Sequence, residues 1–131
     1  MNDDPRPDVH DRARRGRLDA FADAFRGLKI LLLTQPNARI HAVATVAVAG
    51  LGWWLKLSSG EWVLIVTAIT MVWVAEGLNT ALEFVVDIAS PQKQRLAGWA
   101  KDVAAAAVLM ASIGASVIGF LVFLPRLMAR F

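Results

Sequence analysis

The stretch Ala104–Leu124 constrains the fold more than any other feature, because no charged residue interrupts it. As an α-helix it would be about 31 Å long, which matches the roughly 30 Å hydrocarbon layer of a bilayer. Hydrophobic residues make up 56% of the 131-residue chain, more than a soluble domain of that size is able to bury. The sequence therefore predicts an all-α integral membrane protein.

Two more apolar stretches precede this one. Residues 40–55 are apolar except for His41 and Thr45, and with their flanking residues they predict a first span of about 38–57. The second predicted span covers 62–88 and the third covers 100–124. Ser90 and Pro91 indicate the start of the last helix, because Ser is a good N-cap and Pro is favoured in the first turn.

The ends of the chain have a different composition. Residues 1–17 are rich in Arg, Asp and Pro and predict a disordered basic tail. The apolar residues of 18–33 recur at helical spacing, with charged residues over the rest of the surface, which predicts an amphipathic helix at the membrane surface. Residues 18–125 then form a single predicted membrane domain, followed by a short external tail, 126–131.

Basic residues give the orientation. Three spans place the termini on opposite sides, and eleven of the fourteen Lys and Arg residues then lie on the side of the N-terminus. Lys56, Arg126 and Arg130 lie on the other side. The positive-inside rule therefore predicts a cytoplasmic N-terminus and an external C-terminus.

The second predicted span ends with polar residues. On a helix, Glu76, Glu83 and Asp87 share one narrow face and Asn79 lies at its edge. Glu76 would lie roughly 9 Å beneath the inner edge of the hydrocarbon, where a carboxylate is costly unless it is paired, protonated or in a polar cavity. Such residues are functional by default, the alternative being a polar seam that joins helices.

Something positive must face these acids, either a metal ion or the Lys101-Asp102 pair at the start of the third span. Glu76 and Glu83 would be about 10 Å apart along the helix axis, too far to share one ion readily. Glu76 therefore suits a buried base, and Glu83 suits a hydrated cation near the headgroups.

The pattern Glu76-x-x-Asn79-Thr80-Ala81-x-Glu83-x-x-x-Asp87, followed by Ala100-Lys101-Asp102, closely resembles the prokaryotic diacylglycerol kinase family. Members of this family are small integral-membrane lipid kinases, and the resemblance covers roughly residues 20–125. Arg39-Ile40-His41 is more similar to the branch from Gram-positive bacteria, whose members favour undecaprenol. The resemblance implies an ATP-dependent kinase of undecaprenol or diacylglycerol in the bacterial inner membrane. It also implies a homotrimeric bundle with active sites shared between neighbouring chains at the cytoplasmic face.

The resemblance also implies roles for individual residues. Glu76 would be the general base that takes the proton of the lipid hydroxyl, and Asn79 would orient it by a hydrogen bond. Glu83 would hold the Mg²⁺ bound to ATP. Lys101 and Asp102 would contact the nucleotide, and Asp87 would support the site.

One position departs from the family pattern. The family has a metal-binding glutamate six residues before the position of His41, and this chain has Gln35 there. An amide oxygen is able to coordinate a cation but brings no negative charge, so we expect weaker Mg²⁺ affinity.

Other readings remain open at this point. A non-catalytic membrane protein, or a small ion-coupled carrier that uses the acids as a proton relay, has the same acid face. His41, beside Arg39 at a predicted membrane boundary, is interpreted as an interfacial polar residue. The arginines of the tail favour anionic headgroups as partners, so no nucleic acid is expected.

Overall fold

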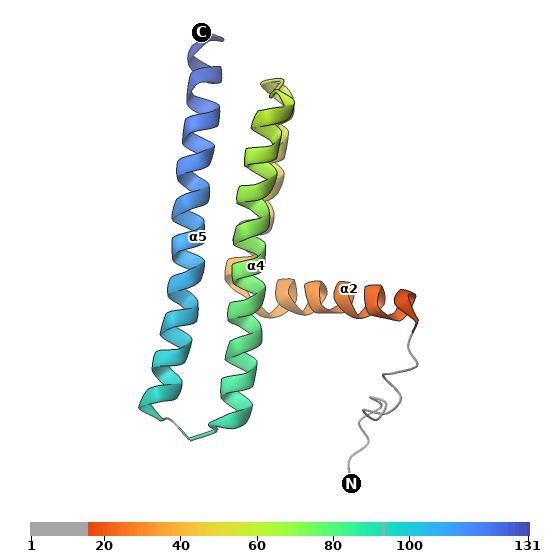
Figure 1. Cartoon of the computed structure of the whole chain (residues 1–131), viewed down its shortest axis with the longest axis vertical. Helices are drawn as coiled ribbons and strands as arrows, with labels where there is room; N and C mark the ends of the chain where they lie inside the picture. The colour runs from red at the N-terminus through yellow and green to blue at the C-terminus, as the bar shows by residue number, and fades with distance from the viewer. Residues whose placement is uncertain (1–15, 93) are drawn as a thin grey trace. The chain divides into compact units, whose positions relative to one another are not determined.

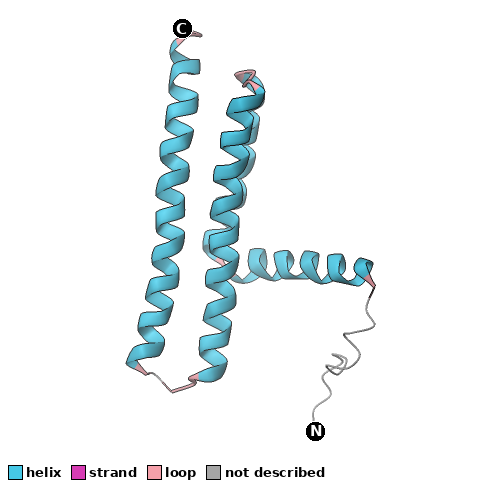
Figure 2. Cartoon of the chain, viewed as in Figure 1, coloured by secondary structure: helices cyan, strands magenta, loops and turns pink. Residues whose placement is uncertain are grey.

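The computed structural model describes residues 16–92 and 94–131, so the predicted tail 1–17 falls almost wholly outside it. Four helices follow one another: α2 (Arg17–Thr34), α3 (Pro36–Trp54), α4 (Ser59–Ala89) and α5 (Arg95–Met128). Figure 2 shows helices and connecting loops, and the described part of the chain contains no strand. The all-α class is therefore confirmed. The chain divides into two compact units, one ending at Thr34 and one beginning at Gln35.

The first unit contains α2, whose large apolar side chains are exposed. Phe21 and Phe25 are 65% and 71% exposed. Arg26 and Asp23 form an ion pair of 3.0 Å on its surface. A helix that presents both aromatic and charged side chains to its surroundings has the composition of an interfacial helix.

In the second unit, small residues line the face of α3 that meets α4. Ala38 is fully buried, and Thr45 accepts a hydrogen bond from Trp73 Nε1 at 3.0 Å. Gly52 is also buried, and a Cβ placed on it would lie 2.9 Å from the Trp62 ring. These residues let α3 and α4 approach closely.

The turn between α3 and α4 is closed by side chains. Ser58 caps α4 and forms a capping box with Glu61. Glu61 also accepts a hydrogen bond from Arg126 Nε of α5 at 2.8 Å. The end of α4 near the turn is thereby tied to the last turns of α5. Close by lies the buried apolar cluster of Leu55, Leu57, Ile65, Val122 and Phe123.

α4 and α5 run antiparallel and side by side, drawn in green and blue in Figure 1. The predicted helix start at Ser90 and Pro91 is wrong: Ser90 is the C-cap of α4, and α5 begins at Arg95 with Gln94 as its N-cap. Proline is common just after a helix end as well as in a first turn, so the Ser-Pro pair did not distinguish the two.

Two helices among the described residues, α4 and α5, are long and apolar enough to cross a membrane. α3 has 19 residues and carries Arg39 and His41 near its start, which shortens its apolar part. Most large apolar side chains of these helices face outward, including Val74, Ile88 and Phe120. The fold is that of a helical membrane protein with a small internal core.

Candidate active site on α4

The most deeply buried large side chain of the described residues is the carboxylate of Glu76, which is 1% exposed. Neither of its oxygens has a hydrogen-bond partner. The side-chain oxygens of its neighbours Asn79 and Thr80 are also buried without partners. Buried polar atoms are nearly always satisfied in folded proteins, so three such residues within two turns of one helix indicate a site.

Glu83 follows Glu76 two turns along α4 and is held by two amides. Gln35 Nε2 donates to Glu83 Oε2 at 3.3 Å, and Asn79 Nδ2 donates to Glu83 Oε1 at 3.2 Å. The expected hydrogen bond from Asn79 to Glu76 is not formed. Asn79 and Glu83 are four residues apart, a spacing that brings side chains together on a helix. Gln35 lies at the N-cap of α3, so this carboxylate joins two helices.

Asp87, one turn further, pairs with Lys101 of α5 at 2.5 Å. The two side chains are 64% and 36% exposed, so the pair lies at the solvated end of the acid face. Asp102 is exposed next to Lys101. The structure thus brings Gln35, Asn79 and Glu83 into one cluster, with the Asp87–Lys101 pair beyond it toward the loop.

The donor set bears on the expected metal. No group of three or more His, Cys, Asp or Glu side chains suited to a metal ion occurs among residues 16–92 and 94–131. Glu83 is the single carboxylate of its cluster. Mg²⁺ in nucleotide sites is commonly held by one or two carboxylates together with substrate phosphates and waters. The residues therefore fit a Mg²⁺ that arrives on a nucleotide, and they do not fit a resident ion held by the protein alone.

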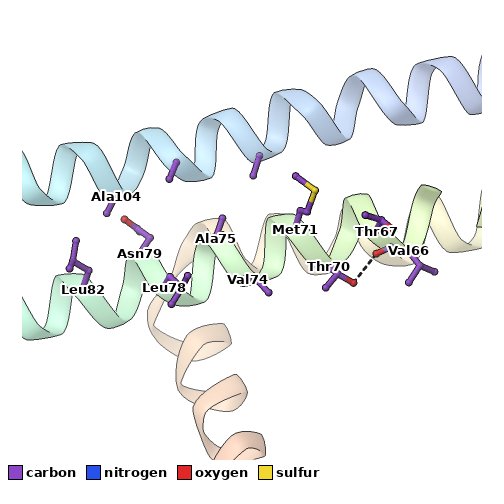
Figure 3. Close-up of a pocket in the computed structure, with 12 residues that line it drawn as sticks. Val66, Thr67, Thr70, Met71, Val74, Ala75, Leu78, Asn79, Leu82 and Ala104 are labelled. Atoms are coloured by element: carbon purple, nitrogen blue, oxygen red, sulfur yellow. Dashed lines mark hydrogen bonds between the residues drawn. The ribbon is translucent and has the colours of Figure 1, made fainter. Parts of the chain in front are cut away.

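Two hollows lie along α4. An apolar groove of about 780 Å³ runs between α4 and α5, and in Figure 3 Asn79 points from α4 toward the helix that carries Ala104. A second cavity of about 420 Å³ lies between α3, α4 and α5 and is lined by His41, Thr45 and Trp73 among others.

His41 is a site neighbour that sequence reasoning missed. Its side chain is partly buried and close enough to Glu76 to act electrostatically on the carboxylate. The available signal was the helical spacing of Ala38, His41 and Thr45, which places all three on the face of α3 that meets α4.

This arrangement defines a helical membrane protein with an acid face that starts at a buried carboxylate and ends at a solvated ion pair. The sequence profile described as "Prokaryotic diacylglycerol kinase" matches residues 22–123. The chain belongs to the prokaryotic diacylglycerol kinase family.

Individual relatives agree with this assignment. The "Undecaprenol kinase" of Bacillus subtilis is 39% identical over 108 residues, covering 82% of this chain and 88% of that protein. The "Diacylglycerol kinase" of Synechocystis is 39% identical over 113 residues, covering 86% of this chain and 65% of that protein. The "Diacylglycerol kinase" of Escherichia coli K12 is 32% identical over 96 residues, covering 73% and 79%. The lipid-kinase class implied by the resemblance to this family is thereby confirmed.

Proposed function

We propose that this protein transfers the γ-phosphate of ATP to the hydroxyl of undecaprenol at the cytoplasmic face of a bacterial inner membrane. The observation that carries the proposal is the buried Glu76, whose oxygens have no hydrogen-bond partner, at one end of an acid face that leads to Asp87 and Lys101. Undecaprenol is preferred over diacylglycerol because the Bacillus relative is named for it and aligns over 88% of its length.

In the proposed reaction, Glu76 accepts the proton of the lipid hydroxyl while that oxygen bonds to the γ-phosphorus. The bond from the γ-phosphorus to the bridging oxygen breaks, and ADP leaves. Positioning and charge neutralisation supply most of the rate of such a transfer. The base then has only to accept the proton of the lipid hydroxyl, and a carboxylate just beneath the inner edge of the hydrocarbon is placed to do so.

The remaining polar residues hold the nucleotide. Glu83, oriented by Gln35 and Asn79, would bind the Mg²⁺ that accompanies ATP, and the ion would supply charge neutralisation on the phosphates. In the present structure, Lys101 donates a hydrogen bond to Asp87, which orients the lysine. When the nucleotide binds, Lys101 would leave Asp87 and contact the phosphates. Asp102 would contact the remainder of the nucleotide.

We further propose that residues 18–125 act as one membrane domain with three spans, α3 included, and that three chains form a homotrimer. The exposed apolar faces of α4 and α5 support this, because they must be covered by lipid or by other subunits. The single carboxylate near Gln35 supports a site completed by a neighbouring chain.

The decisive experiment uses purified protein in lipid micelles with MgATP and either undecaprenol or diacylglycerol. Wild type is expected to phosphorylate undecaprenol with the higher kcat/KM. Glu76→Gln is expected to lower kcat by about 100-fold or more, because it removes the base. Glu61→Gln, at the other end of the same helix, is the matched control and should retain activity.

The same preparation separates the alternative functions. An ion-coupled carrier or a non-catalytic protein would phosphorylate neither lipid and would show no Mg²⁺-dependent binding of ATP. That result would overturn the kinase proposal.

A further inference from the structure

Two hydrogen bonds define how α3 and α4 face each other. Gln35 contacts Glu83 at one end and Thr45 contacts Trp73 at the other. The helices are antiparallel, so the residues between Gln35 and Thr45 face those between Glu83 and Trp73. His41, one turn before Thr45, is thereby placed at the level of Glu76. Its electrostatic effect on that carboxylate agrees with this placement.

The groups that surround Glu76 on each helix can be named. On α4 itself, Glu83 adds a like charge two turns away. On α5, the contacts Asp87–Lys101 and Glu61–Arg126 place Ala111 and Ser112 opposite Glu76. No charged residue occurs on α5 between Asp102 and Arg126. Nothing on α5 at this level therefore compensates a negative charge.

On α3, Arg39 and His41 are the titratable residues near this level. Arg39 is exposed and lies about 200° around the helix from His41, on the face turned away. Within the described part of residues 35–131, His41 is therefore the ionisable group of opposite charge that faces Glu76. Its side chain also lines the cavity between the three helices, so it is not confined to the surface.

A buried carboxylate without hydrogen bonds is unstable in its ionised form unless a positive charge lies nearby. Only the ionised form is able to accept a proton. We propose that His41 is the charge partner that keeps Glu76 ionised and ready to act as the base. His41 is a positioning residue here, since it acts through Glu76, and the inference rests on the proposed kinase function.

The test compares His41→Gln, His41→Lys and the control Ser112→Ala, which alters another residue of the same cavity. His41→Gln is expected to lower kcat by about 10-fold or more at neutral pH, with the KM for MgATP changed less than about twofold. His41→Lys restores a cation and is expected to recover at least about a third of wild-type kcat. Ser112→Ala is expected to match wild type.

Infrared spectroscopy gives a readout that a purely structural role would not move. In wild type at neutral pH, Glu76 should be ionised and should give no protonated-carboxyl band. The spectrum of Glu76→Gln should therefore lack no such band that wild type has. In His41→Gln such a band should appear, and it should vanish in the double variant with Glu76→Gln. The comparison of wild type with Glu76→Gln tests the proposal even if the His41 variants fail to fold.

The outcomes are distinct. If wild type phosphorylates no lipid, the proposed function fails, whatever the infrared spectra show. If wild type is active and already has a protonated Glu76, the role of His41 is wrong. The role of His41 is also wrong if His41→Gln keeps wild-type kcat. It is wrong as well if His41→Gln and His41→Lys are equally impaired and neither variant shows the protonated-carboxyl band.

Discussion

Glu83 shows how one neutral side chain alters an acidic site. Its two oxygens accept hydrogen bonds from the amides of Gln35 and Asn79, so both donors orient a single negative charge. A second carboxylate at position 35 would remove one donor and place a like charge about 3 Å away. The metal response of the protein should therefore depend on residue 35.

We expect Gln35→Glu to lower the Mg²⁺ concentration for half-maximal activity by about tenfold, through the added Coulomb attraction. Without divalent ions the two carboxylates repel, so the variant should melt below wild type in detergent. Added Mg²⁺ should raise its melting temperature more than that of wild type. Thermal unfolding across a Mg²⁺ titration checks the change independently of activity.

Gln92→Glu is the matched control, because Gln92 is exposed in the loop between α4 and α5. It should leave the Mg²⁺ response unchanged. Equal responses of Gln35→Glu and wild type would show that residue 35 lies outside the metal environment.

At this scale, the sequence predicted the acids but not their partners. Glu76, Glu83 and Asp87 follow from helical spacing within one segment, which is local information. The groups that face them, His41 and Gln35, come from α3, and their level depends on the register between two helices. That register is set by the packing of small residues such as Ala38, and spacing along α4 does not contain it.

Among the elements, α3 and α4 pack closely together at the buried Gly52. A Cβ on this residue would lie 2.9 Å from the Trp62 ring, and 3.1 Å from the Leu57 side chain. Either the ring or the helix must shift to accept a methyl group. The approach of the two helices at this end therefore requires glycine.

We predict that Gly52→Ala destabilises the protein by about 1–3 kcal/mol, the usual cost of overpacking. Denaturant unfolding in detergent measures it. Gly50→Ala lies on the same helix and its Cβ would meet nothing within 4 Å, so it should cost little. A Gly52→Ala variant as stable as Gly50→Ala would mean that the Trp62 ring moves aside freely.

Helix ends were harder to predict than helices. The apolar stretches indicated α4 and α5, but the signals at their ends were ambiguous. Pro125 lies inside α5, which continues to Met128. Ser58 with Glu61 is a capping box, a recognisable start signal that lies just before the predicted start of the second span at residue 62.

For the whole molecule, the number of crossings decides which side each end occupies. Two helices, α4 and α5, have the length and composition of spans. Whether α3 also crosses determines whether α2 lies on the side of the α4–α5 loop or on the opposite side. The proposed three-span arrangement places both on the cytoplasmic side.

The chain contains no cysteine, so single introduced thiols report their own position. An impermeant thiol reagent should label Ser59→Cys in intact cells. Ala20→Cys and Gln92→Cys should react only after permeabilisation. If Ala20→Cys instead reacts like Ser59→Cys, α3 does not cross the membrane and the three-span proposal is wrong.

The lengths of α4 and α5, 31 and 34 residues, have a consequence for how the two substrates meet. Helices of about 46 and 51 Å exceed a 30 Å hydrocarbon layer, so with one end at the far boundary roughly 15 Å or more of the hairpin would stand in the cytosol in the proposed orientation. Extracting a polyprenyl chain would cost about 0.8 kcal/mol for each buried CH₂. In the proposed reaction, a protruding hairpin would avoid that desorption, because it would bind the nucleotide above the membrane surface and bring it to a lipid that stays in the bilayer.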